Sequence, residues 1–191
     1  HKPDRRQRQM CIRDSTLPAI LERNSIKFGE KPAFREKEFG IWQSWNWREV
    51  HEHVNNMSLG LINLGIKEGE HICIIGRNRP HLYWSIIAAQ NVGAIPTPLY
   101  QDSVAQEMIF PISHCSAKMA IVENQEQVDK LLEIKKDITS LKNIIYLDPR
   151  GLRNYKKNNL YSLSDVFTLK NIENVSKPVS YTHLRAHETS I

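Results

Sequence analysis

The apolar positions of the chain fall into two alternating patterns between residues 46 and 147. Short apolar runs, typical of buried strands, recur over 71–75, 94–99, 117–122 and 143–147. Segments with apolar residues three and four positions apart, typical of amphipathic helices, lie between these runs. Because helix and strand alternate four times, the pattern predicts an α/β fold, in which helices cover a mostly parallel sheet.

The clearest helix is predicted to follow Asn46. Asn46 with Glu49 three positions later is a variant of the capping box. One apolar stripe then runs along the helix: Trp47, Val50, Val54, Met57, Leu61 and Leu64. Gly65 is expected to end this helix in the left-handed conformation. His51 and His53 are two positions apart and face different sides, so we interpret them as a solvated flank rather than a metal site.

The segment before this helix predicts a helix over 17–27 and then a hairpin. Two short strands, 33–37 and 41–44, flank the turn residues Phe39 and Gly40. Trp42 and Trp45 are interpreted as packing anchors, because singly placed aromatic residues usually fill a core.

After the first strand of the sheet, Pro80 suits the start of a helix that is apolar nearly all round and therefore buried on more than one side. Pro96 and Pro98 place the next strand at a sheet edge or on an irregular path. Ser103 is expected to cap a helix that reaches residue 113. Further helices are predicted over 125–136 and 162–167, with a turn at 148–151 and a polar loop at 152–160.

The composition is that of a globular chain. Of 191 residues, 40% are hydrophobic and 25% are charged. No apolar run approaches the about 20 residues of a membrane span, and no secretory signal pattern is present. The cysteines, Cys11, Cys73 and Cys115, form neither a CxxC pair nor a metal-binding spacing. This usage fits a reducing compartment and predicts a cytoplasmic protein.

The formal net charge of +5 is concentrated near the start of the chain. Residues 1–15 carry five basic and two acidic residues, and residues 178–191 carry one of each. The middle of the chain therefore holds a balance of only +2. A charge this small argues for no particular partner, and we expect no nucleic acid to bind.

Both ends of the chain resemble translated reagent DNA. The segments RRQRQMCIRDS (5–15) and VSYTHLRAHET (179–189) are similar, over eleven consecutive residues each, to translations of the two ends of a transposon-type sequencing adapter. We therefore expect residues 1–15 and 178–191 to be disordered, adapter-like artefacts and exclude His1, Cys11, His183 and His187 from any site. The alternative for 5–13 is a basic arm that binds nucleic acid or a targeting peptide.

The loop GRNRP (76–80) is the first candidate site. It connects a strand to a helix, where α/β folds usually bind phosphate, so Arg77, Arg79 and the helix N-terminus could attract an anion. However, the chain contains no G-x-G and no G-K-[ST] sequence, and a phosphate cradle needs the close backbone approach that glycine permits. We interpret the loop as structural, with arginines that pair with nearby carboxylates or water.

The remaining candidates are weaker. Adjacent residues such as His114 and Cys115 rarely reach the geometry of a Cys/His nucleophile, so both Cys115 and Cys73 are interpreted as structural. His81 and His114 are too isolated to indicate a metal. An acidic set on the helix over 125–136 is expected to be a solvated face rather than a catalytic pair: Glu123, Glu126 and Asp129. No catalytic, cofactor-binding or metal-ligating residue is assigned.

A set of segments nevertheless occurs in an informative order. The segments are FGEKPAF, SWNWREVHEHV, LGIKEGEHICIIGRNRPHLYW, VGAIPTPLY, SAKMAIVEN and IIYLDPRG. Over 17–167 this order resembles the N-terminal part of the adenylate-forming ligases, and most of all the long-chain fatty acyl-CoA synthetases. The resemblance implies an incomplete N-terminal portion of their large AMP-binding domain, over 16–177. Gly65, Gly69, Gly93 and Pro98 match landmarks of that scaffold.

The resemblance also implies a function. Such enzymes activate a fatty acid with ATP and Mg²⁺ to acyl-AMP and transfer the acyl group to coenzyme A. The catalytic motifs of the family follow the matched region, so we expect this fragment to be inactive. We also expect strand 71–75 and its neighbours to keep unpaired edges and the fragment to fold poorly alone.

The partners implied for the parent enzyme are a fatty acid, ATP and coenzyme A, with no nucleic acid. A peripheral contact with a membrane surface is a further expectation. Two alternatives stay open. One is a self-contained α/β module that binds an anion at GRNRP, and the other is an adenylate-forming ligase for another carboxylate.

Overall fold

A parallel sheet forms the centre of the protein, in a computed structural model that describes residues 16–155 and 158–169. Its strand order is β4-β3-β5-β6-β7 and every pair is parallel. The strands are β3 (His71–Ile75), β4 (Ile95–Leu99), β5 (Met119–Val122), β6 (Asn143–Tyr146) and β7 (Leu160–Ser162). The predicted α/β fold with a mostly parallel sheet is therefore confirmed.

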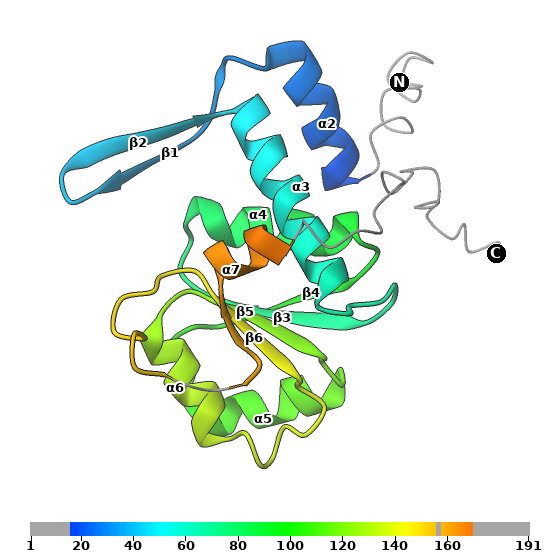
Figure 1. Ribbon diagram of the computed structural model, residues 1–191, viewed down its shortest axis with the longest axis vertical. Helices are drawn as coiled ribbons and strands as arrows, with labels where there is room; N and C mark the ends of the chain where they lie inside the picture. The colour runs from blue at the N-terminus through cyan, green and yellow to red at the C-terminus, as the bar shows by residue number, and fades with distance from the viewer. Residues whose placement is uncertain (1–15, 156–157, 170–191) are drawn as a thin grey trace, which may run out of the picture.

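Helices cover both faces of this sheet (Figure 1). One face carries α3 (Trp47–Asn63), α4 (Pro80–Asn91) and α7 (Leu163–Thr168), and the other carries α5 (Ala105–His114) and α6 (Gln125–Glu133). The first described helix, α2 (Leu17–Phe28), packs on α3 and α4. None of the helices within the described ranges is long and apolar enough to cross a bilayer.

The central strands β3 and β5 are almost entirely apolar because successive side chains enter different cores. In β3, Ile72 and Ile74 join the core under α3 and α4, while Cys73 and Ile75 join the core under α5 and α6. The same alternation holds in β5. Met119 and Ile121 join the core under α3 and α4, and Ala120 and Val122 join the core under α5 and α6. A strand buried on both faces has no polar position to reveal its period, which explains the unbroken apolar runs in the sequence.

The N-terminal hairpin extends away from the layered body (Figure 1). Its strands, β1 (Pro32–Glu38) and β2 (Ile41–Asn46), are antiparallel and joined by Phe39 and Gly40, both with positive φ. The predicted hairpin is thus confirmed, with each strand extending one or two residues further. Trp45 packs against the core, as expected, but Trp42 is 66% exposed and is not a packing anchor in the described residues.

The helix α3 forms as its sequence predicts. The Asn46 side chain accepts from the Glu49 backbone N–H and the Glu49 carboxylate accepts from the Asn46 N–H, both at 2.8 Å, and Gly65 has φ 85°. The predicted solvated flank is wrong for His53, whose ring is half-buried and stacks on Trp84 with 5.1 Å between centroids. Helix α4 packs against α3. The indole of Trp84, which belongs to α4, therefore covers the ring of His53.

The edges of the sheet are partly as expected. Strand β4, with Pro96 and Pro98, lies at one edge, where missing backbone donors cost least. The expectation of unpaired edges is wrong for β3, which lies between β4 and β5, whereas its neighbour β4 is an edge strand of the described sheet. At the far side β7 pairs with β6, within a segment that the sequence predicted as loop and short helix. Strand β7 has only three residues, which is too short for the apolar and polar alternation of a strand to be recognised in the sequence.

Two helix boundaries also differ from the prediction. Helix α5 begins at Ala105, and Val104 rather than Ser103 is its N-cap. The Glu107 carboxylate accepts from the Val104 backbone N–H at 3.3 Å and satisfies it without a capping hydroxyl. Helix α6 ends at Glu133, three residues earlier than predicted, because Ile134 leaves the helical conformation as its C-cap.

Gly60 offers a test of the packing between α3 and α7. A Cβ there would lie 2.2 Å from Cγ1 of Val166 and 2.7 Å from its carbonyl oxygen. Replacing glycine by alanine inside a helix ordinarily stabilises by about 0.5–1 kcal/mol. We expect Gly60→Ala instead to lower the free energy of unfolding by about 1–3 kcal/mol, because the added methyl group separates the two helices. Urea denaturation measures this change.

Glu52→Ala, at an exposed position of the same helix, is the control and should change stability by less than about 0.5 kcal/mol. A Gly60→Ala protein that is as stable as the parent chain would contradict the packing of α7 on α3.

Candidate functional site

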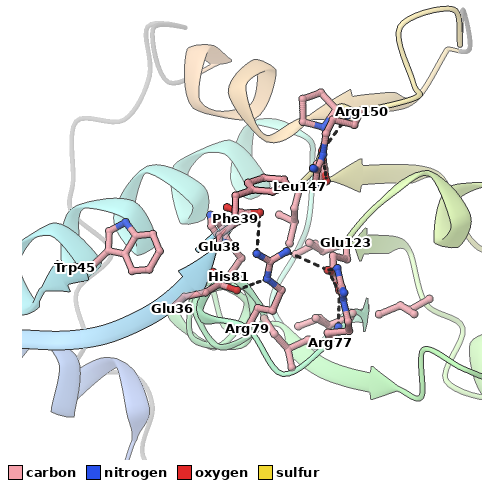
Figure 2. Close-up of a pocket in the computed structure, with 17 residues that line it drawn as sticks. Glu36, Glu38, Phe39, Trp45, Arg77, Arg79, His81, Glu123, Leu147 and Arg150 are labelled. Atoms are coloured by element: carbon pink, nitrogen blue, oxygen red, sulfur yellow. Dashed lines mark hydrogen bonds and ion pairs between the residues drawn. The ribbon is translucent and has the colours of Figure 1, made fainter. Parts of the chain in front are cut away.

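A cavity of about 350 Å³ opens at the carboxyl ends of β3, β5 and β6. In open α/β sheets ligands bind outside the carboxyl ends of the strands, so this cavity is the candidate site. The hairpin β1–β2 and the start of α4 supply its other walls (Figure 2). Its apolar lining comprises Phe39, Trp45, Ile74, Ile75, Leu82, Ile121 and Leu147. Its charged lining comprises Glu36, Glu38, Arg77, Arg79, Glu123, Asp148 and Arg150.

The carboxylate of Glu123 is the centre of the charged part. Glu123 directly follows β5, and its side chain is only 9% exposed. Its Oε1 accepts from Nε and Nη2 of Arg77 at 2.8 and 2.6 Å, and its Oε2 accepts from the Arg77 backbone N–H at 2.6 Å. Nη1 of Arg79 lies 3.5 Å from Oε1. One carboxylate therefore fixes the loop after β3 to the end of β5.

Two opposing effects act on the pKa of Glu123. Burial removes water from the carboxylate and by itself raises the pKa. The hydrogen bonds from Arg77 and the charges of Arg77 and Arg79 favour the ionised form, and together they hold the pKa below its ordinary value. Glu123 is consequently an anion at neutral pH and not a proton donor.

Arg79 connects the same loop to the hairpin. Its Nε donates to Glu36, and its Nη2 donates to Glu38 at 3.0 Å (Figure 2). The side chains of Arg79 and Glu36 are 24% and 15% exposed, so water screens this ion pair only partly. The hydrogen bond to Glu36 is the main reason that the pKa of Arg79 rises above its ordinary value.

Arg150, in the turn after β6, completes the charged lining. Its guanidinium donates to both carboxylate oxygens of Asp148, and the hydrogen bond is the main cause of the lowered pKa of Asp148. The guanidinium carbon of Arg150 also lies 5.4 Å from the ring centroid of Phe39, so the turn contacts the hairpin.

An aromatic cluster borders the cavity on the side of α4. His81 lies 4.6 Å from Trp84 and 6.3 Å from Trp45, between ring centroids. Burial lowers the pKa of His81, so the imidazole is neutral at neutral pH. A second space of about 80 Å³ adjoins His81, and the Trp84 indole N–H has no hydrogen-bond partner among the described residues.

The structure tests the predictions made for the charged candidates of the sequence. The prediction that Arg77 and Arg79 pair with carboxylates is confirmed. The prediction that Glu123 belongs to a solvated acidic face is wrong, because it precedes α6 and is buried, whereas Glu126 and Asp129 are exposed on that helix. The position of Glu123 directly after an apolar strand is the signal that could have revealed its role.

The cysteine and histidine candidates do not come together as a catalytic pair. Cys73 is fully buried in β3, and desolvation raises the pKa of its thiol, so the structural interpretation of Cys73 is confirmed. Cys115 is partly buried against the same core, and its thiol donates to the Ile112 carbonyl at 3.6 Å. His114 stacks on Phe110 instead, with 5.3 Å between ring centroids.

The cavity lining does not fit a triphosphate with its metal ion. Each lining arginine already pairs with a carboxylate, so none is available to a phosphate. Among residues 16–155 and 158–169, no three His, Cys, Asp or Glu side chains group to hold a metal. Three arginines and four carboxylates pair with one another at the junction of hairpin and sheet, with a balance of 3 − 4 = −1. No chemical step is assigned to them.

Comparison with known proteins identifies the family. The profile of the AMP-binding enzyme family matches residues 21–179, which is most of the chain. The long-chain-fatty-acid–CoA ligase ACSBG2 of Homo sapiens is 28% identical over 155 residues, covering 81% of this chain and 23% of the human protein. The chain thus spans about a quarter or less of the length of the curated relatives it matches.

Solved structures support the same fold. The anthranilate CoA ligase AuaEII, in complex with anthranoyl-AMP, matches with a TM-score of 0.68 and 21% identity, over 79% of this chain and 27% of that one. Coronafacic acid ligase from Pectobacterium brasiliense matches with a TM-score of 0.67 and 20% identity, over 86% of this chain and 30% of that one.

The chain therefore belongs to the AMP-binding enzyme family, the adenylate-forming ligases. Within this class its sequence relatives are AMP-forming acyl-CoA synthetases. The adapter-like segments 1–15 and 178–191 lie outside the described residues.

The ion pairs of the buried Glu123 carboxylate predict a specific dependence of stability on pH. A carboxylate whose pKa is lowered by folding stabilises the protein above its unfolded pKa, ordinarily 4.5 for Glu, and loses this contribution as the pH falls through the folded value. We expect Glu123→Gln to reduce the free energy of unfolding by about 1–3 kcal/mol at neutral pH, because Arg77 and Arg79 lose their anion. The difference from the parent chain should shrink as the pH falls below 4.5.

Denaturant unfolding over a pH series measures this difference. Glu126→Gln is the matched control, because the Glu126 side chain is 65% exposed, and it should change stability by less than about 0.5 kcal/mol at every pH. A Glu123→Gln difference that stays constant from neutral to acidic pH would exclude the ionised pair as its source.

Proposed function

We propose that this chain is the N-terminal scaffold of a ligase that activates a long-chain fatty acid with ATP, through an acyl-AMP intermediate, and transfers the acyl group to coenzyme A. The similarity to the long-chain-fatty-acid–CoA ligases over three quarters or more of the chain supports this proposal. ATP, Mg²⁺ and coenzyme A are the cofactors and substrates of the proposed parent enzyme.

The described residues contribute architecture to this enzyme. The carboxylate of Glu123 forms ion pairs with Arg77 and Arg79. The cavity beside these residues has a floor of apolar strand residues. Nothing in this arrangement activates a carboxylate or stabilises a leaving pyrophosphate. We accordingly propose that the 191-residue chain is inactive by itself and that the reacting groups bind elsewhere in the parent enzyme.

A ligase for another carboxylate is the second candidate. The structural neighbours are described as ligases of anthranilate and of coronafacic acid, and their identity to this chain is 20–21%. Ligases of different acids therefore share a similar fold, so the fold alone does not identify the acid on which a ligase acts. The relatives by sequence favour a fatty acid, which is why long-chain fatty acids stand first.

An independent anion-binding module has less support. That hypothesis requires Arg77 or Arg79 to face an anion in the GRNRP loop. Arg77 instead donates both Nε and Nη2 to Oε1 of Glu123, and Arg79 contacts three carboxylates, of Glu36, Glu38 and Glu123.

The proposal is tested by acid-dependent exchange of labelled pyrophosphate into ATP. The protein to assay is the product of the genomic reading frame continued past Lys177, with a panel of long-chain, short-chain and aromatic carboxylates. We expect exchange with long-chain fatty acids, and acyl-CoA formation when coenzyme A is added. The 191-residue chain, assayed in parallel, should give no exchange above the blank.

Each outcome bears on a different part of the proposal. Exchange only with aromatic or short-chain acids would replace the fatty acid by another carboxylate. Exchange catalysed by the 191-residue chain would contradict its role as a scaffold. A continued frame that gives no exchange with any carboxylate would contradict the ligase function.

A further inference from the structure

The aromatic cluster around Trp84 leaves one buried polar group without a partner. Trp84 is 3% exposed, and its indole Nε1–H donates to no other described residue. Four rings surround the indole at centroid separations of 4.6 to 6.1 Å: Phe34, Trp45, His53 and His81. Because an unsatisfied buried donor destabilises a fold, such donors nearly always have a partner in the protein, a water molecule or a ligand. The Trp84 N–H is therefore expected to meet an acceptor from outside the described residues.

A cavity of about 80 Å³ lies beside this indole. Trp84 forms part of its wall, and His81 and Leu147 line both this cavity and the larger one of the candidate site. The two spaces therefore share a wall. Apolar side chains of α3, of α7 and of the position after β6 supply most of the remaining lining: Met57, Leu147, Leu163 and Phe167.

The size of the cavity limits what it can hold. A water molecule occupies about 30 Å³ in the liquid, and an apolar cavity of about 150 Å³ is known to take benzene. A space of about 80 Å³ is consequently too small for an aromatic ring. It suits a molecule of about three or four non-hydrogen atoms.

The lining favours a neutral molecule with one polar end. None of the described residues that line the cavity is Asp, Glu, Lys or Arg, so a charged ligand would lose its hydration without gaining a counter-ion. The Ser85 hydroxyl also lines the cavity, but it already donates to the His81 backbone carbonyl at 2.7 Å. The Trp84 N–H is thus the donor that is available to an oxygen in this space.

We propose that the cavity beside Trp84 is a binding site for a small neutral oxygen compound, a short-chain alcohol or ketone, whose oxygen accepts a hydrogen bond from the indole N–H. The alkyl part of this ligand lies against Met57, Leu163 and Phe167. The site is separate from the chemistry of the proposed ligase, and the inference does not rest on that function.

Water is the competing occupant. Two or three water molecules would also fill the volume, and one of them could accept from Trp84. A buried water molecule ordinarily makes two to four hydrogen bonds, however, whereas most side chains of this lining are apolar. An alkyl group needs no such partners, so the walls favour an organic ligand over water.

Nuclear magnetic resonance of the ¹⁵N-labelled 191-residue chain tests the proposal, with 2-propanol and acetone as probes. The chain has four tryptophans, whose indole resonances are assigned by single Trp→Phe substitutions. We expect both probes to shift the Trp84 N–H resonance saturably, with a dissociation constant on the order of 10 mM for about four non-hydrogen atoms. Acetate has the same number of non-hydrogen atoms but carries a charge, and it should produce no saturable shift.

Two substitutions alter the site in different ways. Trp84→Phe removes the N–H and keeps an aromatic ring, and Leu163→Phe reduces the space while the N–H remains. Each should weaken binding at least about fivefold, as measured from the Met57 methyl resonance. Trp42→Phe, at a position that is 66% exposed, is the matched control and should leave the dissociation constant unchanged. Circular dichroism checks the fold of each variant, and Leu163→Phe tests the same cavity if Trp84→Phe does not fold.

Other results would overturn the proposal. A Trp84 N–H resonance that neither probe shifts would leave water as the occupant. Equal shifts of all four indole resonances would indicate a general solvent effect, and acetate that binds as tightly as acetone would contradict the preference for a neutral ligand. Site variants that bind both probes like the parent chain would exclude this cavity. None of these measurements involves pyrophosphate exchange, so their failure is distinguishable from a failure of the ligase function.

Discussion

The buried carboxylate of Glu123 is the constraint on which the junction between sheet and hairpin depends. A carboxylate this far from water is tolerated only if it is paired and hydrogen-bonded. Arg77 supplies three hydrogen bonds, one of them from its backbone, and Arg79 supplies a second positive charge. These requirements fix the path of the GRNRP loop and thus the position at which α4 begins.

The same network extends from the sheet to the hairpin through Arg79. Its guanidinium lies between Glu123 at the end of β5 and the two glutamates of β1, so a two-stranded hairpin is bound to the body by charge. An isolated hairpin is marginally stable in water. The ion pairs of Arg79 and the packing of Trp45 against Trp84, with 5.3 Å between ring centroids, compensate for this. The cavity between hairpin and sheet is a consequence of that attachment.

Much of the fold could be predicted from the sequence because its signals are local. The capping box at Asn46, the left-handed Gly65 and the prolines of the edge strand each act within a few residues. The role of Glu123 could not be predicted in the same way, because its partners, Arg77 and Arg79, come from the loop after β3, 46 positions away in the case of Arg77. His53 was misassigned for a similar reason, since its burial comes from Trp84 of another helix.

The candidate site is accordingly better explained by a structural role than by a catalytic role. The sequence already indicated that the arginines of GRNRP pair with carboxylates, but it did not identify which ones. Each arginine that lines the cavity at the strand ends pairs with a carboxylate of the described residues. The described residues position the hairpin against the sheet.

The central claim, that Arg79 holds the hairpin to the sheet, is tested most directly by amide hydrogen exchange in β1 and β2. Arg79→Gln removes the charge that Glu36, Glu38 and Glu123 share, and Arg35→Gln, at an exposed position of β1, is the matched control. The account predicts exchange in the hairpin that is at least about tenfold faster in Arg79→Gln than in the parent chain, with β3 and β5 unchanged. Equal hairpin protection in Arg79→Gln and Arg35→Gln would contradict it.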